Sequence, residues 1–198
     1  MIYKAVLTSG VGLLLAVSAT AQTNPLPIKK SKNTGLFNIT QIGYNAGVGQ
    51  ATYRSDVVLD YRGSVNRFRT TFGYFLNPAV SVGLGFGLDG YHEPSYNTAP
   101  LVADVRYYRQ PTGNSLFITG NGGYALKLGA GFERGVTTGL HVGYRVIAGR
   151  STNLLFSVGP EAQQIQDARI NLIGPGSFEQ IESTIWLKSI SFNAGFLF

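Results

Sequence analysis

The chain has 198 residues, of which 44% are hydrophobic and only 13% are charged, with a formal net charge of +6. This length indicates one domain, and the absence of cysteine excludes disulfide bonds, thiolate metal sites and a lipid-modified N-terminal cysteine. Mild basicity suits anionic lipid headgroups, and because an exported chain seldom meets nucleic acid, no nucleic-acid partner is expected.

Residues 1–21 have the pattern of a secretory signal peptide. Lys4 precedes an apolar run over 11–17, and Ala19-Thr20-Ala21 provides the small residues that signal peptidase accepts. The apolar run is too short to cross ~30 Å of hydrocarbon, and no later segment approaches 18 uninterrupted apolar residues, so a helical membrane protein is excluded. A short buried helix is the alternative for this segment. Residues 22–35, with two prolines and three lysines, predict a flexible periplasmic lead-in.

From residue 36 onward the dominant signal is period-two alternation of apolar with polar or small residues, which predicts β-strands. Turn residues separate the segments, and no stretch shows a convincing helical period. Residues 49–62 are polar and predict a loop, with the extension of a strand above the membrane over 57–61 as the alternative. The eight predicted main strands are 36–48, 63–76, 80–91, 99–109, 115–128, 135–147, 153–163 and 184–198.

The predicted connections alternate between long and short. Outer-membrane barrels have short periplasmic turns and longer outer loops, so both chain ends are expected in the periplasm. The last long loop is predicted over 165–183, around Gly174-Pro175-Gly176. Aromatic residues at strand ends predict two girdles, Tyr74, Tyr107, Tyr144 and Phe198 at the inner end and Tyr91 and Trp186 at the outer end.

The glycine string at 83–87 could be taken for a nucleotide loop. It lacks a following helix and a lysine-serine pair, so we interpret its glycines as small inward residues that a narrow barrel needs. The final strand ends on alternating aromatic residues, Phe192, Phe196 and Phe198.

These segments carry a family resemblance. The strings FGYFLNPAVSVGLGFGLDGYH and PLVADVRYY and the terminal aromatic strand resemble the small eight-stranded outer-membrane barrels of the OmpA/OmpX-like superfamily, particularly the outer membrane protein β-barrel domain proteins of Bacteroidetes-like bacteria. The resemblance covers residues 36–198 and implies an all-β, eight-stranded antiparallel up-and-down transmembrane β-barrel, integral to the outer membrane. It also implies that the barrel-assembly machinery reads Phe192, Phe196 and Phe198.

An eight-stranded barrel has an interior just wide enough for side chains to fill. Opposite charges within it should pair, because an unpaired buried charge is expensive. The structural interpretation is therefore a plug, and a narrow conducting path is the alternative. The predicted interior polar network is Arg67, Arg69, Asp89, Asp104, Arg106, Lys127, His141, Arg145 and Glu161.

Catalysis would have to use one of the two histidines. His92 lies near Asp89, Glu93 and Ser95 at the predicted outer rim, where lipid-modifying barrel enzymes keep their acyl-transfer groups, but proximity alone does not make a triad. His141 is predicted to be a satisfied interior residue. We therefore predict no catalytic residue, no metal site and no cofactor, and keep a lipid-modifying enzyme as an alternative.

A secreted, lipocalin-like soluble barrel would show the inverse alternation, with an apolar interior. The favoured function is a structural, envelope-integrity or surface-binding role exercised through the outer loops. Expected partners are outer-membrane lipid, lipopolysaccharide, the barrel-assembly machinery and a protein at the outer loops.

Overall fold

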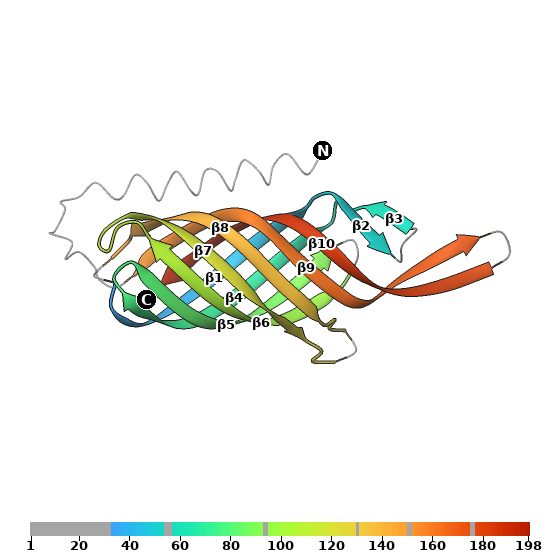
Figure 1. The fold of residues 1–198 in the computed structure, drawn as a ribbon, viewed down its shortest axis with the longest axis horizontal. Helices are drawn as coiled ribbons and strands as arrows, with labels where there is room; N and C mark the ends of the chain where they lie inside the picture. Colours follow the sequence, from blue (N-terminus) through green and yellow to red (C-terminus); the bar gives the residue numbers. More distant parts are fainter. Residues whose placement is uncertain (1–32, 54–56, 93–94, 130, 150–151, 175–176) are drawn as a thin grey trace, which may run out of the picture.

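The computed structural model describes residues 33–53, 57–92, 95–129, 131–149, 152–174 and 177–198. Within these ranges, eight strands close into an antiparallel barrel and two short strands form a separate hairpin at one end (Figure 1). The predicted all-β barrel is confirmed. Over the same ranges, no helix has the length and apolar character needed to cross a membrane.

Each barrel strand pairs with the next barrel strand along the chain, and the small hairpin is inserted between the first and the second of them. The barrel closes where the first strand meets the last, from Ile39 opposite Leu197 to Gly47 opposite Ser189. The barrel strands are β1 (Gly35–Gly47), β4 (Ser64–Asn77), β5 (Val80–His92), β6 (Asn97–Tyr108), β7 (Ser115–Leu126), β8 (Gly135–Ile147), β9 (Asn153–Gly174) and β10 (Ser177–Leu197). The small hairpin consists of β2 (Gln50–Tyr53) and β3 (Val57–Asp60). The loop predicted over 49–62 therefore contains two short strands, and 57–60 pairs within this hairpin and does not extend a barrel strand.

The alternation of the sequence becomes the two faces of the wall. On β5, Leu84 is 72% exposed and points outward, whereas its neighbour Gly85 is buried. Large apolar side chains cover the outside of the other barrel strands in the same way. This inside-out arrangement excludes the soluble, lipocalin-like alternative, because water would face a continuous apolar surface.

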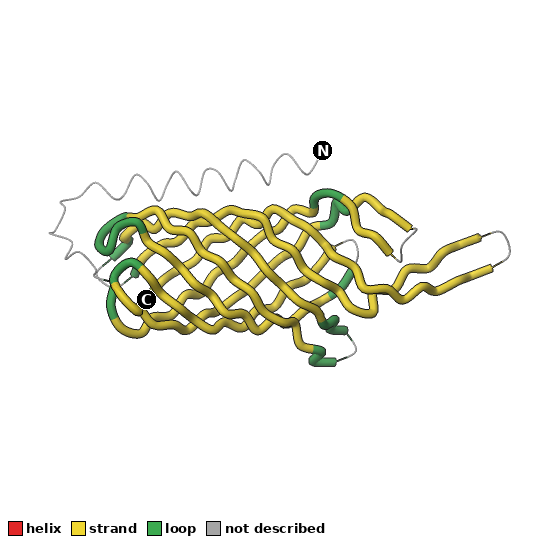
Figure 2. Tube along the Cα trace, in the orientation of Figure 1, coloured by secondary structure: helices red, strands yellow, loops and turns green. Residues whose placement is uncertain are grey.

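Short turns and the C-terminus lie at the same end of the barrel (Figures 1 and 2). The tightest turn joins β4 to β5, where the Asn77 side-chain oxygen accepts hydrogen bonds from the backbone N–H groups of Ala79 and Val80 at 2.8 and 2.9 Å. This local bond explains why the Asn-Pro pair reads as a turn signal. At the opposite end, the connections are longer. We call the end with the short turns the inner end and the opposite end the outer end.

The predicted long loop over 165–183 is wrong. The backbone of β9 continues to Gly174 and that of β10 starts at Ser177, and the two remain paired from Gly174 opposite Ser177 downward. They project beyond the barrel as a two-stranded ribbon (Figure 2). The register shifts once, between Ser183 and Ile185. Between the two paired strands only residues 175–176 are left, and these lie outside the described residues.

The expected signal peptide, residues 1–21, lies outside the described residues, as do residues 22–32. The end of the expected flexible lead-in is fixed. Asn33 is buried, and its side-chain nitrogen donates to the carbonyl of Pro78 at 2.7 Å while its backbone N–H donates to the carbonyl of Pro111 at 3.3 Å. Two inner turns therefore hold the residue that leads into β1.

Candidate functional site

The barrel interior is filled by three layers of side chains, and the predicted polar residues concentrate in the middle one. Arg67 lies at its centre. It pairs with Asp89 through two hydrogen bonds of 2.7 Å and also donates to Glu161 from across the barrel. His141 Nε2 lies 3.6 Å from the same Glu161 carboxylate. These four side chains come from β4, β5, β8 and β9, so the cluster ties together both halves of the wall.

A second group lies beside the first. Asp104 contacts Arg106 at 3.2 Å and accepts a hydrogen bond of 2.7 Å from the Thr119 hydroxyl. Arg69 is also buried, and its Nε and Nη2 atoms have no hydrogen-bond partner among the described residues. Three arginines therefore share the layer with three carboxylates, so the middle layer is close to neutral when His141 is uncharged.

Arg145 lies apart from these groups, near the inner turns. Its guanidinium donates to the carbonyl of Gly113 at 2.8 and 3.1 Å, to the Asn33 side chain, and lies 4.8 Å from the centre of the Tyr108 ring. Backbone carbonyls and an aromatic face thus replace a carboxylate partner. Arg145 closes the inner end of the barrel.

Lys127 does not belong to the interior network. It is exposed and follows the end of β7 at Leu126, so its side chain is not held on the inner face. The prediction extended the alternation two residues too far. The remaining predicted network residues, Arg67, Arg69, Asp89, Asp104, Arg106, His141, Arg145 and Glu161, are buried inside the barrel.

The middle layer leaves almost no free space. The cavity bounded by Arg69, Asp104, Arg106 and His141 has a volume of about 10 Å³. A cavity needs roughly that volume to hold a single water molecule. Among the described residues, the cavity at this point of the packed layer is therefore no larger than about one water molecule.

Two apolar layers, which the sequence pattern did not predict, enclose the polar one. The outer layer packs Ala51 and Tyr61 of the first outer connection against barrel residues such as Val65, Ile165 and Leu187. The inner layer consists of Phe37, Ile39, Phe75, Tyr108, Phe117, Leu155 and Leu197. Pairs of consecutive apolar residues at the inner strand ends, such as Phe75-Leu76 and Leu154-Leu155, are the signal that could have revealed the inner layer.

Glycines make room for the inner layer. Phe37 is opposite Gly73 and Phe117 is opposite Gly143, and a Cβ at either glycine would overlap the facing ring. The glycines at 85 and 87 similarly leave space for Thr71 and Arg69. The interpretation of the 83–87 string as small inward residues is confirmed.

Among the described residues, no catalytic group is assembled around His92. His92 is exposed, whereas Asp89 is buried and bound to Arg67, because residues three apart on a strand face opposite sides. Glu93 lies outside the described residues. Among the described residues, no cluster of three or more His, Asp or Glu side chains could hold a metal ion.

Comparison with known proteins gives structural matches only. No protein-family model matches the sequence, and no curated protein is significantly similar to it. Outer membrane protein OprG from Pseudomonas aeruginosa matches with a TM-score of 0.50 at 10% identity, over 84% of this chain and 96% of that one. This chain has the fold of a small outer-membrane β-barrel.

Two further structures are similar to this outer-membrane-type barrel at lower scores. Neisserial surface protein A matches with a TM-score of 0.49 at 13% identity, over 82% of this chain and 97% of that one. A de novo designed transmembrane β-barrel matches with a TM-score of 0.42 at 15% identity, over 85% and 98% respectively.

The residues assigned to the assembly signal lie on the outer face of the last strand. Phe192, Phe196 and Phe198 are 52%, 48% and 56% exposed, and the rings of Phe196 and Phe198 stack with their centres 6.2 Å apart. The backbone of Phe198 exchanges two hydrogen bonds with Asn38 on β1, at 2.9 and 3.1 Å. The terminal residue therefore takes part in closing the barrel.

Proposed function

We propose that this chain is an integral outer-membrane protein whose closed barrel anchors binding hairpins at the cell surface, with a structural or envelope-integrity role. The observation that carries the proposal is the filled interior. The polar layer, whose cavity beside Arg69 and His141 has a volume of about 10 Å³, is covered by an apolar layer at each end, so the barrel is suited to rigidity and unsuited to general diffusion.

The arrangement of the connections supports an orientation. Short turns and the C-terminus share one end, and outer-membrane barrels place short turns in the periplasm. The ribbon formed by the ends of β9 and β10 and the β2–β3 hairpin then face outward. Both chain ends would be periplasmic.

The outer hairpins are the surface that the proposal assigns to binding. The β2–β3 hairpin is attached to the barrel through Ala51 and Tyr61, which are buried, while Val58 and Leu59 remain 49% and 47% exposed. Apolar groups on a rigidly held hairpin suit contact with a protein or with lipopolysaccharide. The ribbon extends this surface away from the membrane.

Planar-bilayer recording tests the closed interior. Refolded protein should give no stable channels of porin-like conductance, while an open porin recorded in the same membranes should conduct. Stable, porin-sized steps from the folded protein would overturn the anchor proposal and favour a channel.

Epitope tags test the orientation. A tag inserted between Gly174 and Ser177 should bind antibody on intact cells, whereas a tag placed before Asn33 should do so only after permeabilisation. The reverse result would place the ribbon in the periplasm and contradict the proposed surface role.

Replacing the ribbon tests the binding role. A variant in which residues 169–182 become a glycine-serine linker keeps Ala168 and the barrel intact. It should lose cell-surface binding or raise the sensitivity of the cells to detergent. Unchanged binding and unchanged sensitivity would leave the ribbon without the proposed role.

A further inference from the structure

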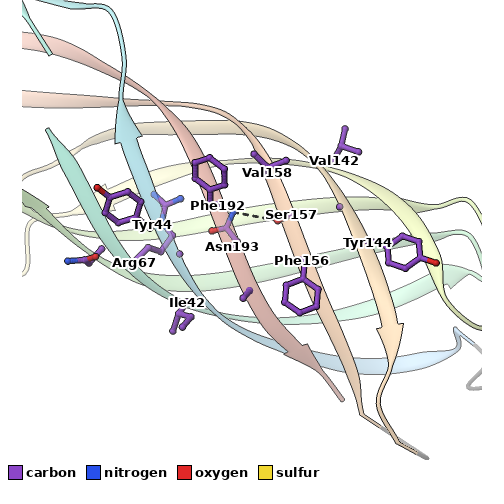
Figure 3. Close-up of a pocket in the computed structure, with 14 residues that line it drawn as sticks. Ile42, Tyr44, Arg67, Val142, Tyr144, Phe156, Ser157, Val158, Phe192 and Asn193 are labelled. Carbon is purple, nitrogen blue, oxygen red and sulfur yellow. Dashed lines mark hydrogen bonds between the residues drawn. The ribbon is translucent and has the colours of Figure 1, made fainter. Parts of the chain in front are cut away.

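A groove crosses the outside of the barrel over five neighbouring strands, β8, β9, β10, β1 and β4, the last contributing Asn66 and Arg67 (Figure 3). Its volume is about 970 Å³, and its walls are almost entirely apolar. Strand register arranges the outward side chains into two parallel rows. One row is Ile42, Ala194, Phe156 and Tyr144, and the other is Tyr44, Phe192, Val158 and Val142.

The groove is hollow because of one small residue. Ala194 lies between Ile42 and Phe156 in its row, so two large side chains flank a methyl group. Beneath this point the wall is closed from inside, where Asn193 donates to Ser157 at 3.5 Å (Figure 3). The groove therefore has an apolar outer surface, and the inner side of the same wall is polar and hydrogen-bonded.

A second depression lies above the groove, at the outer rim of β1 and β10. It has a volume of about 760 Å³ and is lined by exposed Arg62 and Lys188 and by Asp60. Asp60 accepts a hydrogen bond of 3.4 Å from the Gln50 side chain. The Lys188 carbonyl accepts from the backbone of Val48 at 2.9 Å, which fixes β10 beside the chain that leaves β1. Two cations face one carboxylate here, so the depression is net positive.

The two depressions lie on one stripe of the barrel surface. Every second residue of β10 faces outward, and the stripe passes from Ala194 through Phe192 and Ile190 to Lys188 and then Trp186. Lys188 is four residues from Phe192, which corresponds to about 13 Å along a strand. The apolar region is therefore followed along the strand, about 13 Å away, by a cationic region. This separation suits a lipid whose chains lie on the apolar region and whose headgroup lies at the cationic one.

We propose that this stripe binds a phosphorylated, multiply acylated glycolipid of the lipid A type. Its acyl chains would lie in the groove, and a phosphate would contact Lys188 and Arg62. The two rows of outward side chains span three interstrand spacings, about 14 Å, which is broad enough for more than one extended chain. Positive charge at the rim complements the phosphate. The inference requires a bilayer-spanning barrel and does not depend on what the outer hairpins bind.

Trp186 makes the site directly observable, because it is the only tryptophan in the sequence and faces outward next to Lys188 on the stripe. Refolded protein in phosphatidylcholine vesicles is titrated with lipid A while Trp186 emission is followed. We expect a saturable change in emission. Dephosphorylated lipid A and phosphatidylglycerol at the same concentrations should bind far more weakly.

Two substitutions address the two halves of the site. Lys188→Gln combined with Arg62→Gln removes the cations, and Ala194→Phe fills the groove. Each should weaken lipid A binding by about tenfold or more. The matched controls are Lys127→Gln, an exposed cation elsewhere, and Ala103→Phe, an exposed alanine on β6. Both controls should bind as wild type.

Folding of every variant is checked by its heat-modifiable mobility on gels, and Ala194→Leu replaces Ala194→Phe if the larger residue prevents refolding. Equal binding of phosphatidylglycerol, equal losses in the site variants and the controls, or no saturable change in folded wild type would each overturn the proposal. Channel activity of the wild type would contradict the anchor function but leave this titration unaffected.

Discussion

Arg67 and Asp89 are directly opposite each other in the β4–β5 ladder, and the guanidinium meets both oxygens of the carboxylate at 2.7 Å. Both side chains are buried. Glu161 reaches the same arginine from β9. This ion pair is therefore an interior link whose partners cannot turn to solvent when one of them is removed.

Asp89→Asn should destabilise the barrel by about 3–5 kcal/mol, because the substitution leaves buried positive charge without its two-point partner. Urea unfolding in vesicles measures the change. Asp60→Asn is the control, since that carboxylate is exposed and its loss should change the free energy of unfolding by less than about 0.5 kcal/mol. Equal effects from both substitutions would contradict the interior role of the pair.

Val142→Arg should cost about 2–4 kcal/mol of folding stability in a bilayer, because Val142 faces outward at mid-strand on β8. Leu36→Arg, at the inner end of β1, should cost no more than about 1 kcal/mol, because a charge there reaches the interface. Both positions are exposed on the outer face, at 53% and 85%. Unfolding titrations that show no difference between them would mean that the assumed membrane depth is wrong.

Gly143→Ala should destabilise the barrel by about 1–3 kcal/mol, because the new methyl group would overlap the Phe117 ring and the Phe156 carbonyl. Gly120→Ala is the matched strand glycine, with no atom within 4 Å of the added carbon. Its effect on unfolding should be small. A similar loss of unfolding free energy at both glycines would show that the loss reflects strand flexibility and not the space that Phe117 needs.

Deleting Phe198 should leave export intact but slow insertion, because the deletion removes both the terminal aromatic ring and the backbone bonds to Asn38. Pulse-chase labelling with membrane fractionation measures the delay. Phe198→Tyr keeps the ring and the backbone and should insert normally. Wild-type kinetics for the deletion would remove Phe198 from the assembly signal.

Strand positions and the facing of most strand residues could be predicted from the sequence because the bilayer imposes a strict alternation. On β8, for example, predicted and observed bounds coincide at Gly135 and Ile147. Tyr91, which was expected in the outer girdle, is instead buried in the interior. The alternation is informative only where one face meets lipid. Residues 165–183 lie beyond that region, and there β9 and β10 are held together by their backbone pairing. The side chains need not alternate in polarity, so the pattern alone did not predict the ribbon.

The interior was only partly predictable for a related reason. Inward arginines and carboxylates stand out in an apolar sequence, and those within the strands are buried as expected. Inward phenylalanines do not stand out, because they lie next to outward apolar residues, as Phe117 does beside Leu116. Lys127 was wrongly assigned to the interior because the alternation in the sequence continues past Leu126, where β7 ends.

The sequence separation between paired residues differs widely among the strand pairs, and this difference affects the order in which the barrel forms. The β9–β10 ladder joins residues close in sequence, from Gly174 and Ser177 to Asn153 and Leu197, and is the longest ladder among the described residues. Its early contacts close very short loops, whereas the pairing of Ile39 with Leu197 encloses nearly the whole described chain. We therefore expect the C-terminal hairpin to form first and serve as a template, with the β1–β10 seam as the last and slowest step.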